Sequence, residues 1–226
     1  MSCDFRWRYG EGSLVLDPQD FVITRKRKKY KFALFANSPL CYEFDQWEKR
    51  SVDCIEIGAG TGHFSVELAA SQPDKTFVAI DVKADRLQTG AKEAEARGLK
   101  NIFFLRARAD QIAELFAEQA LESIWVTFPD PFPKDRSSKR RLMHPFYLEI
   151  YQTLLQQNGA LYLKHDSRDF FLWSLEQLVA NKWRIDELSF DLHESSLSDI
   201  YKIKTVYEER WLGEGLVTNF TRAFPR

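Results

Sequence analysis

The segment VDCIEIGAGTG, residues 52–62, decides how the rest of the chain is interpreted. Its first half is short and mostly apolar, which is typical of a strand buried on both faces of a parallel sheet. Gly58, Gly60 and Gly62 follow at alternate positions, and the pattern of residues 63–70 predicts a helix directly after them. Glycines at this spacing allow a tight turn and a close approach of a ligand to the main chain. Because the N–H groups at a helix start face a polar ligand, the segment predicts a nucleotide-type pocket.

The spacing of these glycines distinguishes between nucleotide-binding motifs. A dinucleotide-binding loop has the pattern G-x-G-x-x-G, and here His63 occupies the position of its third glycine. A phosphate-binding P-loop requires G-K-[ST], which the segment lacks. The pattern G-x-G-x-G after the acidic Glu56 resembles the first motif of S-adenosylmethionine-dependent methyltransferases of Rossmann-like fold. A dinucleotide-dependent enzyme and a purely structural glycine turn remain the alternatives at this point.

The composition is that of one globular domain or slightly more. The chain has 226 residues, of which 44% are hydrophobic and 29% charged, and its formal net charge is −1. Its three cysteines, Cys3, Cys41 and Cys54, are too far apart for a disulfide framework or a C-x-x-C metal motif. No apolar run approaches the roughly 18 residues of a membrane span, and the N-terminus lacks the apolar core of a signal peptide. We therefore expect a soluble, cytoplasmic protein without a metal site.

From residue 52 onward, segments with strand and helix patterns alternate. Strands are predicted at residues 52–57, 76–81, 102–105, 123–127, 160–164, 183–190 and 205–212, and helices at 63–70, 84–97, 111–120, 144–157 and 169–181. This alternation predicts an α/β fold with a doubly wound, Rossmann-like and mostly parallel seven-stranded sheet, as in class I methyltransferases, whose last two strands are antiparallel. We expect the methyltransferase domain to span residues 51–226, with residues 1–50 as a basic and aromatic arm packed on it.

Two clusters of basic residues stand out in this nearly neutral chain. Residues 25–31 read RKRKKYK, and residues 134–141 contain five Lys or Arg side chains. Aromatic and basic residues are interleaved along the arm, and proteins use these residue types for base stacking and phosphate neutralisation. The clusters therefore favour nucleic-acid binding; the alternative is an ordinary solvated face.

Acidic side chains occupy the predicted carboxyl ends of successive strands, where ligands bind in open α/β sheets. Asp81 ends the second strand, where its carboxylate is placed to accept hydrogen bonds from both ribose hydroxyls of a nucleoside. Asp110 follows the third strand, placed for an adenine amino group, and Glu56 lies near the expected methionine end of the cofactor. A single acid of this kind is more often a strand-end or cap residue, but three beside a glycine loop indicate a cofactor site.

A proline-rich loop, FPDPFPK at residues 128–134, follows the fourth predicted strand. Its alternating prolines fix φ and remove N–H donors, which makes the loop stiff. Such a loop holds Asp130 where its carboxylate can serve a site; the alternative is a connection whose acid caps a neighbouring element. The Asn/Asp-Pro-Pro-Tyr/Phe motif of aminomethyltransferases is absent.

Four motifs in a fixed order carry a more specific resemblance. They are PDPFPK at 129–134, KRRL at 139–142, LKHD at 163–166 and TVYEER at 205–210. This set resembles the tRNA (guanine-N7)-methyltransferase family, whose members carry P-D-P-W-P-K, a basic H-x-K-R-R-like segment, K-T-D and T-x-Y-E-x-R. The similarity extends from about residue 25 to about residue 213. Phe132, His165 and Asp81 depart from the family pattern, which has Trp, Thr and commonly Glu at these positions.

The resemblance implies transfer of a methyl group from S-adenosylmethionine to N7 of guanosine 46 in the tRNA variable loop. It implies a catalytic role for Asp130, which together with Asp166 selects guanine and offsets the charge of the methylated ring. Because guanine N7 has a free lone pair, catalysis would rest on orientation. The implied cofactor-binding residues are Glu56, Gly58, Gly60, Gly62, Asp81, Asp110 and Asp130. The implied substrate-binding residues are Lys134, Asp166, Thr205, Val206, Tyr207 and Glu208. The implied RNA-backbone contacts are Arg25, Lys26, Arg27, Lys28, Lys29, Arg136, Lys139, Arg140 and Arg141.

This interpretation requires S-adenosyl-L-methionine as cofactor and tRNA as partner, with no membrane, no metal and no evident partner subunit. We expect a monomer or a homodimer. The alternatives are a methyltransferase for another RNA base or a small molecule, and a non-catalytic RNA-binding protein of the same fold. A dehydrogenase is disfavoured by His63 in the glycine loop.

Overall fold

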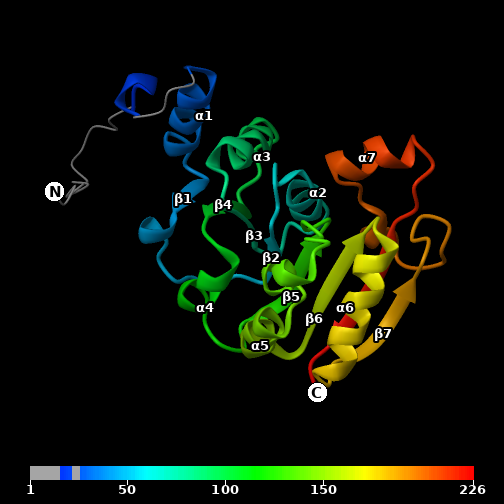
Figure 1. Ribbon diagram of the computed structural model, residues 1–226. Helices are drawn as coiled ribbons and strands as arrows, with labels where there is room; N and C mark the ends of the chain where they lie inside the picture. The colour runs from blue at the N-terminus through cyan, green and yellow to red at the C-terminus, as the bar shows by residue number, and fades with distance from the viewer. Residues whose placement is uncertain (1–15, 22–25) are drawn as a thin grey trace.

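The computed structural model describes residues 16–21 and 26–226 and is built around one eight-stranded sheet (Figure 1). The strands are β1 (Cys41–Glu43), β2 (Cys54–Ile57), β3 (Phe77–Asp81), β4 (Ile102–Arg106), β5 (Leu121–Thr127), β6 (Leu155–His165), β7 (Arg184–Ser189) and β8 (Asn219–Phe224). Their order across the sheet is β1-β4-β3-β2-β5-β6-β8-β7. The pairs among β1 to β6 are parallel, whereas β8 is antiparallel to both its neighbours, β6 and β7.

Two groups of helices cover the two faces of this sheet, each with its own hydrophobic core. The α-helices are α1 (Lys26–Ala36), α2 (His63–Ser71), α3 (Ala84–Ala96), α4 (Ile112–Leu115), α5 (Pro145–Leu154), α6 (Arg168–Ala180) and α7 (Val206–Leu212). Short 3-10 helices are η1 (Pro18–Asp20), η2 (Phe44–Gln46), η3 (Ala109–Gln111), η4 (Asp135–Arg140) and η5 (Asp199–Lys202). Helices α4, α5 and α6 contribute to one core, and α1, α2 and α3 to the other. The predicted doubly wound α/β architecture is confirmed.

The central strand β2 fixes the position of the site. All four of its residues are buried, because helices cover both faces of the sheet, and this explains its apolar sequence. From β2 the chain continues to β3 and β4 on one side, and it later returns to β5 on the other side. In open α/β sheets, ligands bind where the order of strands reverses in this way, outside the carboxyl ends of the strands. The loops after β2 and β5 lie side by side at this point.

The segment before residue 50 contributes a strand to the sheet and a helix that packs on α3. Helix α1 packs on α3, where Phe35 is 1% exposed and the Lys31 ammonium donates to the Asp85 carbonyl at 3.5 Å. Strand β1 pairs with β4, with Cys41 opposite Phe104. The predicted boundary at residue 50 therefore falls after an edge strand of the sheet.

The predicted strand at residues 205–212 is wrong, because Val206–Leu212 forms helix α7. The Thr205 hydroxyl accepts from the Glu208 amide at 2.9 Å, and the Glu208 carboxylate accepts from the Thr205 amide at 3.1 Å. These reciprocal bonds form a capping box, which starts a helix and outweighs the strand preference of Val206 and Tyr207. Strand β8, at Asn219–Phe224, was not predicted; it takes the place in the sheet expected for residues 205–212, and β1 is an eighth strand that was also not predicted.

Two predicted helices are shorter than expected. The segment 111–120 contains only the four-residue α4 after η3, and α5 ends at Leu154 because Leu155 already pairs with Leu121 in the sheet. Over the described parts of the chain, no helix is both long enough and apolar enough to cross a lipid bilayer.

Candidate active site

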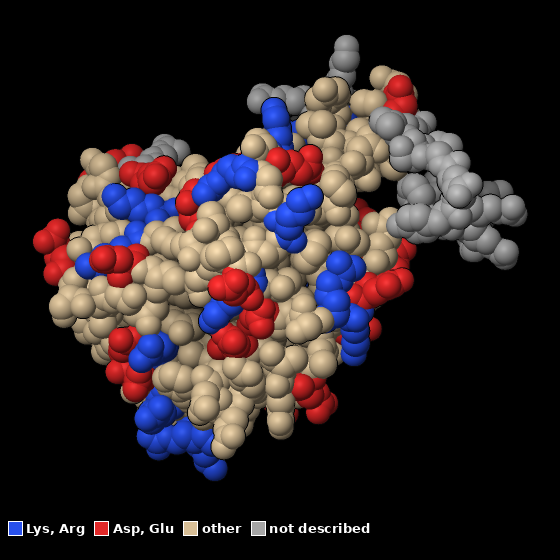
Figure 2. All heavy atoms as spheres, turned by 180° about the vertical axis from the view of Figure 1, so that it is seen from behind, with Lys and Arg blue, Asp and Glu red and all other residues tan. Residues whose placement is uncertain are grey.

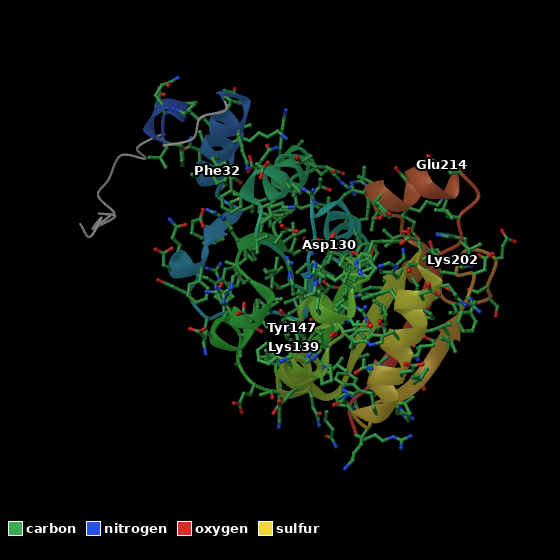
Figure 3. The ribbon with its side chains drawn as sticks, in the orientation of Figure 1. Phe32, Asp130, Lys139, Tyr147, Lys202 and Glu214 are labelled. Carbon is green, nitrogen blue, oxygen red and sulfur yellow. The ribbon has the colours of Figure 1, made fainter. Side chains whose placement is uncertain are left out.

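The candidate site lies along the carboxyl ends of the four central strands, β3, β2, β5 and β6. Asp81 ends β3, the glycine loop follows β2, Asp130 follows β5 and Asp166 follows β6. Figure 3 shows Asp130 in the middle of the molecule, above the ends of these strands. Acids that are far apart in the sequence are therefore brought to one edge of the sheet, as predicted from their places after successive strands.

The glycine loop has the backbone geometry that its sequence predicts. Gly58, Gly60 and Gly62 have φ of +75°, +59° and +73°, a left-handed conformation that favours glycine. Asp81 braces the loop, because one carboxylate oxygen accepts from the Gly60 amide at 2.9 Å and the other from the Lys83 amide at 2.8 Å. A Cβ built on Gly60 meets no atom within 4 Å, so the main chain of the loop is approachable from that side.

Gly90 supports this loop from α3, and sequence reasoning missed it. A Cβ on Gly90 would lie 2.3 Å from the carbonyl oxygen of Thr61 and 2.7 Å from the ring of Phe104. A Cβ on Gly62 would also strike Phe104, at 2.6 Å. The loop and α3 therefore pack in direct contact. A glycine inside a predicted helix is the only sequence signal of this close approach.

Glu56 lies behind the loop rather than beside open space. It is 2% exposed, and its two carboxylate oxygens accept hydrogen bonds from the hydroxyls of Ser65 on α2 and Thr127 on β5. Burial raises the pKa of Glu56 to about 7, although these hydrogen bonds act against the shift. Glu56 therefore ties β2, α2 and β5 together where the site begins.

Asp110 lies in η3, after β4, where the sequence placed it. Its carboxylate pairs with the guanidinium of Arg108, with 2.9 Å between Arg108 Nε and Oδ1. This hydrogen-bonded pair lowers the pKa of Asp110. Its predicted contact with an adenine amino group stays a prediction.

The proline-rich loop presents Asp130 to solvent on a constrained main chain. Asp130 is exposed, whereas Pro129 before it is buried. Phe128 and Phe132, on either side, have φ of +46° and +40°. Non-glycine residues in this left-handed region cost on the order of 1 kcal/mol or more each, and such residues cluster at functional sites. The stiffness predicted from the prolines is thus accompanied by backbone strain.

Arg141 has a different position from the one predicted for an RNA-backbone contact. It is 7% exposed, and its guanidinium donates to the carbonyls of Pro131 at 3.1 Å and Phe132 at 3.1 and 3.3 Å. The group also lies 4.4 Å from the centre of the Trp173 ring. Two of its donors, Nε and Nη2, are therefore directed at the proline-rich loop, and a contact of Arg141 with the RNA backbone stays a prediction that its burial disfavours.

Asp166 and Tyr207 meet at the end of β6. The Tyr207 hydroxyl donates to Asp166 Oδ2 at 3.2 Å, and the Tyr207 ring lies 5.4 Å from that of Phe128. On the other side, Nδ1 of His165 lies 3.1 Å from Asp166 Oδ1. The bond from His165 is the main reason why the pKa of Asp166 is lowered. Tyr207 is 45% exposed, so its ring is accessible beside an ionised carboxylate.

Glu208 is enclosed at the first turn of α7, next to two exposed residues. It is 1% exposed, whereas Val206 and Tyr207 are 54% and 45% exposed. Its carboxylate accepts from Lys164 Nζ at 2.7 Å and from the Thr218 hydroxyl at 2.9 Å. It also contacts Nε2 of His193 at 2.8 Å, in addition to its capping bond to the Thr205 amide. These four partners occupy the two carboxylate oxygens of Glu208. A direct substrate contact by Glu208 stays a prediction.

Lys164 on β6 connects the Glu208 carboxylate to the core of the sheet. Its ammonium is fully buried, donates to the Ile203 carbonyl at 2.8 Å, and lies over the ring of Phe64 at 5.3 Å. Burial lowers the pKa of Lys164, and the Glu208 carboxylate acts against the shift. The sequence motif LKHD marked this position, but the contacts of Glu208 with both Lys164 and His193 required the fold.

The other predicted RNA contacts form two separate groups. Lys28 is exposed and Lys29 half-buried on α1, at the β1 edge of the sheet, whereas Arg136, Lys139 and Arg140 are exposed after the proline-rich loop. Lys134, predicted to bind the substrate, is also exposed there. Arg25 lies outside the described residues, as do the side chains of Lys26 and Arg27. On the reverse face, Lys and Arg are interspersed with Asp and Glu (Figure 2). Charge of one sign does not dominate that face.

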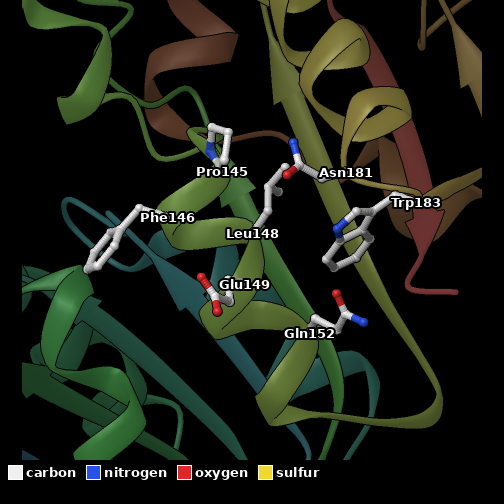
Figure 4. A pocket seen from close by; sticks show the side chains of 7 residues that line it. All are labelled: Pro145, Phe146, Leu148, Glu149, Gln152, Asn181 and Trp183. Atoms are coloured by element: carbon white, nitrogen blue, oxygen red, sulfur yellow. The ribbon is translucent and has the colours of Figure 1, made fainter.

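Two other features lie outside the site. His63, Glu67 and Glu93 bring potential metal-ligand atoms within 4.8 Å of one another, but the Arg97 guanidinium already pairs with both carboxylates. A hollow of about 230 Å³ lies beside α5 and the turn after α6, lined by Pro145, Phe146, Leu148, Glu149, Gln152, Asn181 and Trp183 (Figure 4). None of the predicted site residues lines it.

Known proteins of similar sequence cover most of the chain. The sequence model of the family described as "Putative methyltransferase" matches residues 50–219. A tRNA (guanine-N(7)-)-methyltransferase of Bacteroides fragilis is 34% identical over 216 residues, which cover 87% of this chain and 85% of the relative. The protein of the same name from Mesomycoplasma hyopneumoniae (strain J) is 40% identical over 158 residues, covering 70% of this chain and 78% of the relative.

Solved structures share the fold at lower identity. The structure titled "Structure of an Antibiotic Related Methyltransferase" is 17% identical, with a TM-score of 0.58, over 80% of this chain and 90% of that one. The 16S rRNA methyltransferase KamB is 14% identical, with a TM-score of 0.57 and the same coverage. These two likenesses confirm the methyltransferase fold alone. The sequence relatives go further, and by them the chain belongs to the tRNA (guanine-N7)-methyltransferase family.

Proposed function

We propose that the protein transfers a methyl group from S-adenosylmethionine to N7 of a guanosine in tRNA, at position 46 of the variable loop, forming 7-methylguanosine. The observation that carries this proposal is the placement of two acids, Asp130 and Asp166, after the adjacent strands β5 and β6, beside the glycine loop. Membership of the tRNA (guanine-N7)-methyltransferase family supports it.

The residues around the glycine loop are suited to S-adenosylmethionine. Each carboxylate oxygen of Asp81 accepts one main-chain hydrogen bond and has a further lone pair for a ribose hydroxyl. Main-chain groups at Gly60 are approachable, Asp110 is assigned to the adenine amino group, and Glu56 supports the loop from behind. When bound, the cofactor supplies an electrophilic methyl group on a sulfonium sulfur.

Methyl transfer to guanine N7 requires orientation and charge stabilisation but no general base. The N7 lone pair bonds to the methyl carbon as the carbon–sulfur bond breaks, and the guanine ring becomes positively charged. Asp130 and Asp166 accept hydrogen bonds from N1–H and the exocyclic amine, which distinguishes guanine from adenine, and their charges offset that of the methylated ring. The lowered pKa of Asp166 keeps it ionised for this purpose.

The exposed Lys and Arg side chains are assigned to the tRNA backbone, which they contact without reading sequence. The target guanosine is part of a folded RNA, so it leaves its stack to reach the site, where the accessible ring of Tyr207 packs on it. We place the protein in the cytoplasm, as a monomer or homodimer.

The test uses purified protein, methyl-labelled S-adenosylmethionine and three tRNA transcripts that differ at position 46. The first carries guanosine, the second 7-deazaguanosine, which lacks the N7 lone pair, and the third inosine, which lacks the exocyclic amine. Asp130→Asn removes the proposed catalytic charge with little change of shape, and Asp135→Asn is the matched control on an exposed acid nearby.

We expect only the guanosine transcript to be methylated at full rate, with 7-methylguanosine as the product identified by nucleoside mass spectrometry. We expect no product from the deazaguanosine transcript and a rate lowered at least about tenfold with inosine, because a hydrogen bond to a carboxylate is lost. Asp130→Asn should lose about 100-fold in kcat, and Asp135→Asn should not. Transfer to another base, or equal rates for the three transcripts, would reject the proposal.

A further inference from the structure

The loop that carries Asp130 is held by its carbonyl groups on both sides of the acid. On one side, Nε2 of His165 lies 3.0 Å from the Pro129 carbonyl. On the other side, the Arg141 guanidinium donates to the carbonyls of Pro131 and Phe132. Two buried side chains from different parts of the fold thus contact the residues immediately before and after Asp130.

His165 also contacts the second acid of the site. A carbonyl oxygen only accepts, so Nε2 donates to the Pro129 carbonyl. On the other side of the ring, Nδ1 lies 3.1 Å from Asp166 Oδ1 and 2.8 Å from the Ser167 amide nitrogen. The ring is 3% exposed and packs 4.4 Å from that of Phe170. One imidazole therefore sets the distance between the main chain at Pro129 and the carboxylate of Asp166.

Arg141 differs from its neighbour Arg140, although both are basic residues of one motif. Arg140 is exposed and lies 4.3 Å over the ring of Phe132, whereas Arg141 is enclosed against Trp173. A planar guanidinium reaches two carbonyls at once, which a lysine ammonium on a flexible stem does not reproduce.

The loop needs such external donors because its own main chain provides few. Its three prolines, Pro129, Pro131 and Pro133, have no N–H groups. The positive φ of Phe128 and Phe132 is costly, and strained backbone persists only where surrounding contacts fix it. The hydrogen bonds from His165 and Arg141 are contacts of this kind, in addition to the bond from the Phe128 amide to the Lys164 carbonyl at 2.9 Å.

We propose that His165 and Arg141 are positioning residues that fix the Asp130 loop relative to Asp166 and thereby orient the acceptor base. The role rests on the proposed methyl transfer, but the fixing of the loop is measurable without it. A displacement of Asp130 by about 1 Å would lower kcat by about 10- to 100-fold, because a reaction without a general base depends on alignment.

The variants separate loss of the donor from loss of packing. His165→Leu removes both ring nitrogens, and His165→Gln restores a donor at the end of a side chain of similar length. Arg141→Met keeps an apolar stem on Trp173 but removes the donors, and Arg141→Lys keeps the charge without the planar fork. Arg222→Met is the control, because Arg222 is a partly buried arginine on β8 that bonds Tyr201 and Asp186, outside the site.

Two measurements decide the proposal. The first is amide hydrogen exchange at Phe128 and Ser137, at the two ends of the loop, whose amides donate to the carbonyls of Lys164 at 2.9 Å and Lys134 at 2.8 Å. It needs neither cofactor nor tRNA. The second is kcat and KM for 7-methylguanosine formation in variants that retain a cooperative thermal transition. We expect faster exchange at these two amides and a lower kcat with unchanged KM for tRNA in His165→Leu and Arg141→Met. We expect partial recovery of kcat in His165→Gln.

Unchanged exchange in both donor-deleting variants would reject the fixing of the loop. Faster exchange with unchanged kcat, or an equal loss of kcat in Arg222→Met, would reject the positioning role. If the wild-type protein forms no 7-methylguanosine, the proposed function fails, and the exchange measurement still decides whether these two residues fix the loop.

Discussion

The Nζ atom of Lys164 lies 2.7 Å from Oε2 of Glu208, and both side chains are fully enclosed, with 0% and 1% of their surfaces exposed. Lys164 lies on β6, two residues before Asp166, and Glu208 follows Tyr207 on α7. This ion pair therefore attaches the helix that carries Tyr207 to the strand that carries Asp166. Its strength decides whether those two residues stay together.

Removal of the cation should be costly for folding. We expect Lys164→Met to lower the free energy of unfolding by about 3–5 kcal/mol, because the Glu208 carboxylate is left buried without the ammonium. Lys75→Met is the control, because Lys75 pairs with Glu122 on the surface, where an ion pair contributes about 1 kcal/mol or less. Urea denaturation of both variants measures the difference, and equal losses would show that Lys164 and Glu208 are not coupled in this way.

The buried carboxyl of Glu56 should make stability depend on pH. Its pKa of about 7 lies above the ordinary 4.5, so between these values the folded protein holds a proton that the unfolded chain releases. Stability is therefore lost as pH rises from about 5 to 7, and the variant Glu56→Gln should gain up to about 3 kcal/mol relative to wild type across that interval.

Urea denaturation at pH 5, 6, 7 and 8 tests this expectation. Glu118→Gln, an exposed carboxyl on the surface, serves as the comparison. A constant difference between Glu56→Gln and wild type at the four pH values would contradict the assignment of the raised pKa to Glu56.

A methyl group on Gly90 should damage the cofactor loop. In an ordinary helix, Gly→Ala stabilises by about 1 kcal/mol, but here the new Cβ would lie 2.3 Å from the Thr61 carbonyl. We expect Gly90→Ala to weaken S-adenosylmethionine binding at least about tenfold, because the loop must move. Gly98→Ala is the control: its φ is +69° but no atom lies within 4 Å of its Cβ, so stability should fall while calorimetric affinity for the cofactor stays the same.

The salt dependence of tRNA binding should separate Arg140 from Arg141. A side chain that neutralises one phosphate contributes about 0.7–0.9 to the slope of log affinity against log salt concentration. Arg140→Gln should reduce the slope by about that amount, because Arg140 is exposed. Arg141→Gln should leave the slope unchanged, because its guanidinium is enclosed. Filter binding at several salt concentrations measures both slopes, and a reduced slope for Arg141→Gln would return this residue to the RNA contacts.

Local patterns in the sequence predicted the cofactor half of the site. The spacing of Gly58, Gly60 and Gly62 specifies the backbone of the loop, and Asp81 and Asp130 are placed by the strands they follow. Neither inference needs contacts between distant residues, because parallel strands end at a common edge.

Features that depend on packing between distant residues could not be predicted from local sequence patterns. Arg140 and Arg141 are neighbouring basic residues of one motif, and the tertiary fold, which packs Arg141 against Trp173 and the carbonyls of Pro131 and Phe132, decides which one is buried. Residues 205–212 contain the capping pair Thr205 and Glu208, but their aromatic and β-branched residues suggested a strand. The capping pattern was the stronger signal.

Strand β8 lies between β6 and β7, although it follows both of them in the chain. The pairs that join β1 to β5 use no residue beyond Thr127, so that half of the sheet can assemble while the ribosome is still adding the rest. Until Asn219–Phe224 emerges, β6 and β7 expose open edges that can pair with other chains. The strand order therefore allows a stage of synthesis at which the half of the sheet that ends at β5 is paired while β6 and β7 are open to aggregation.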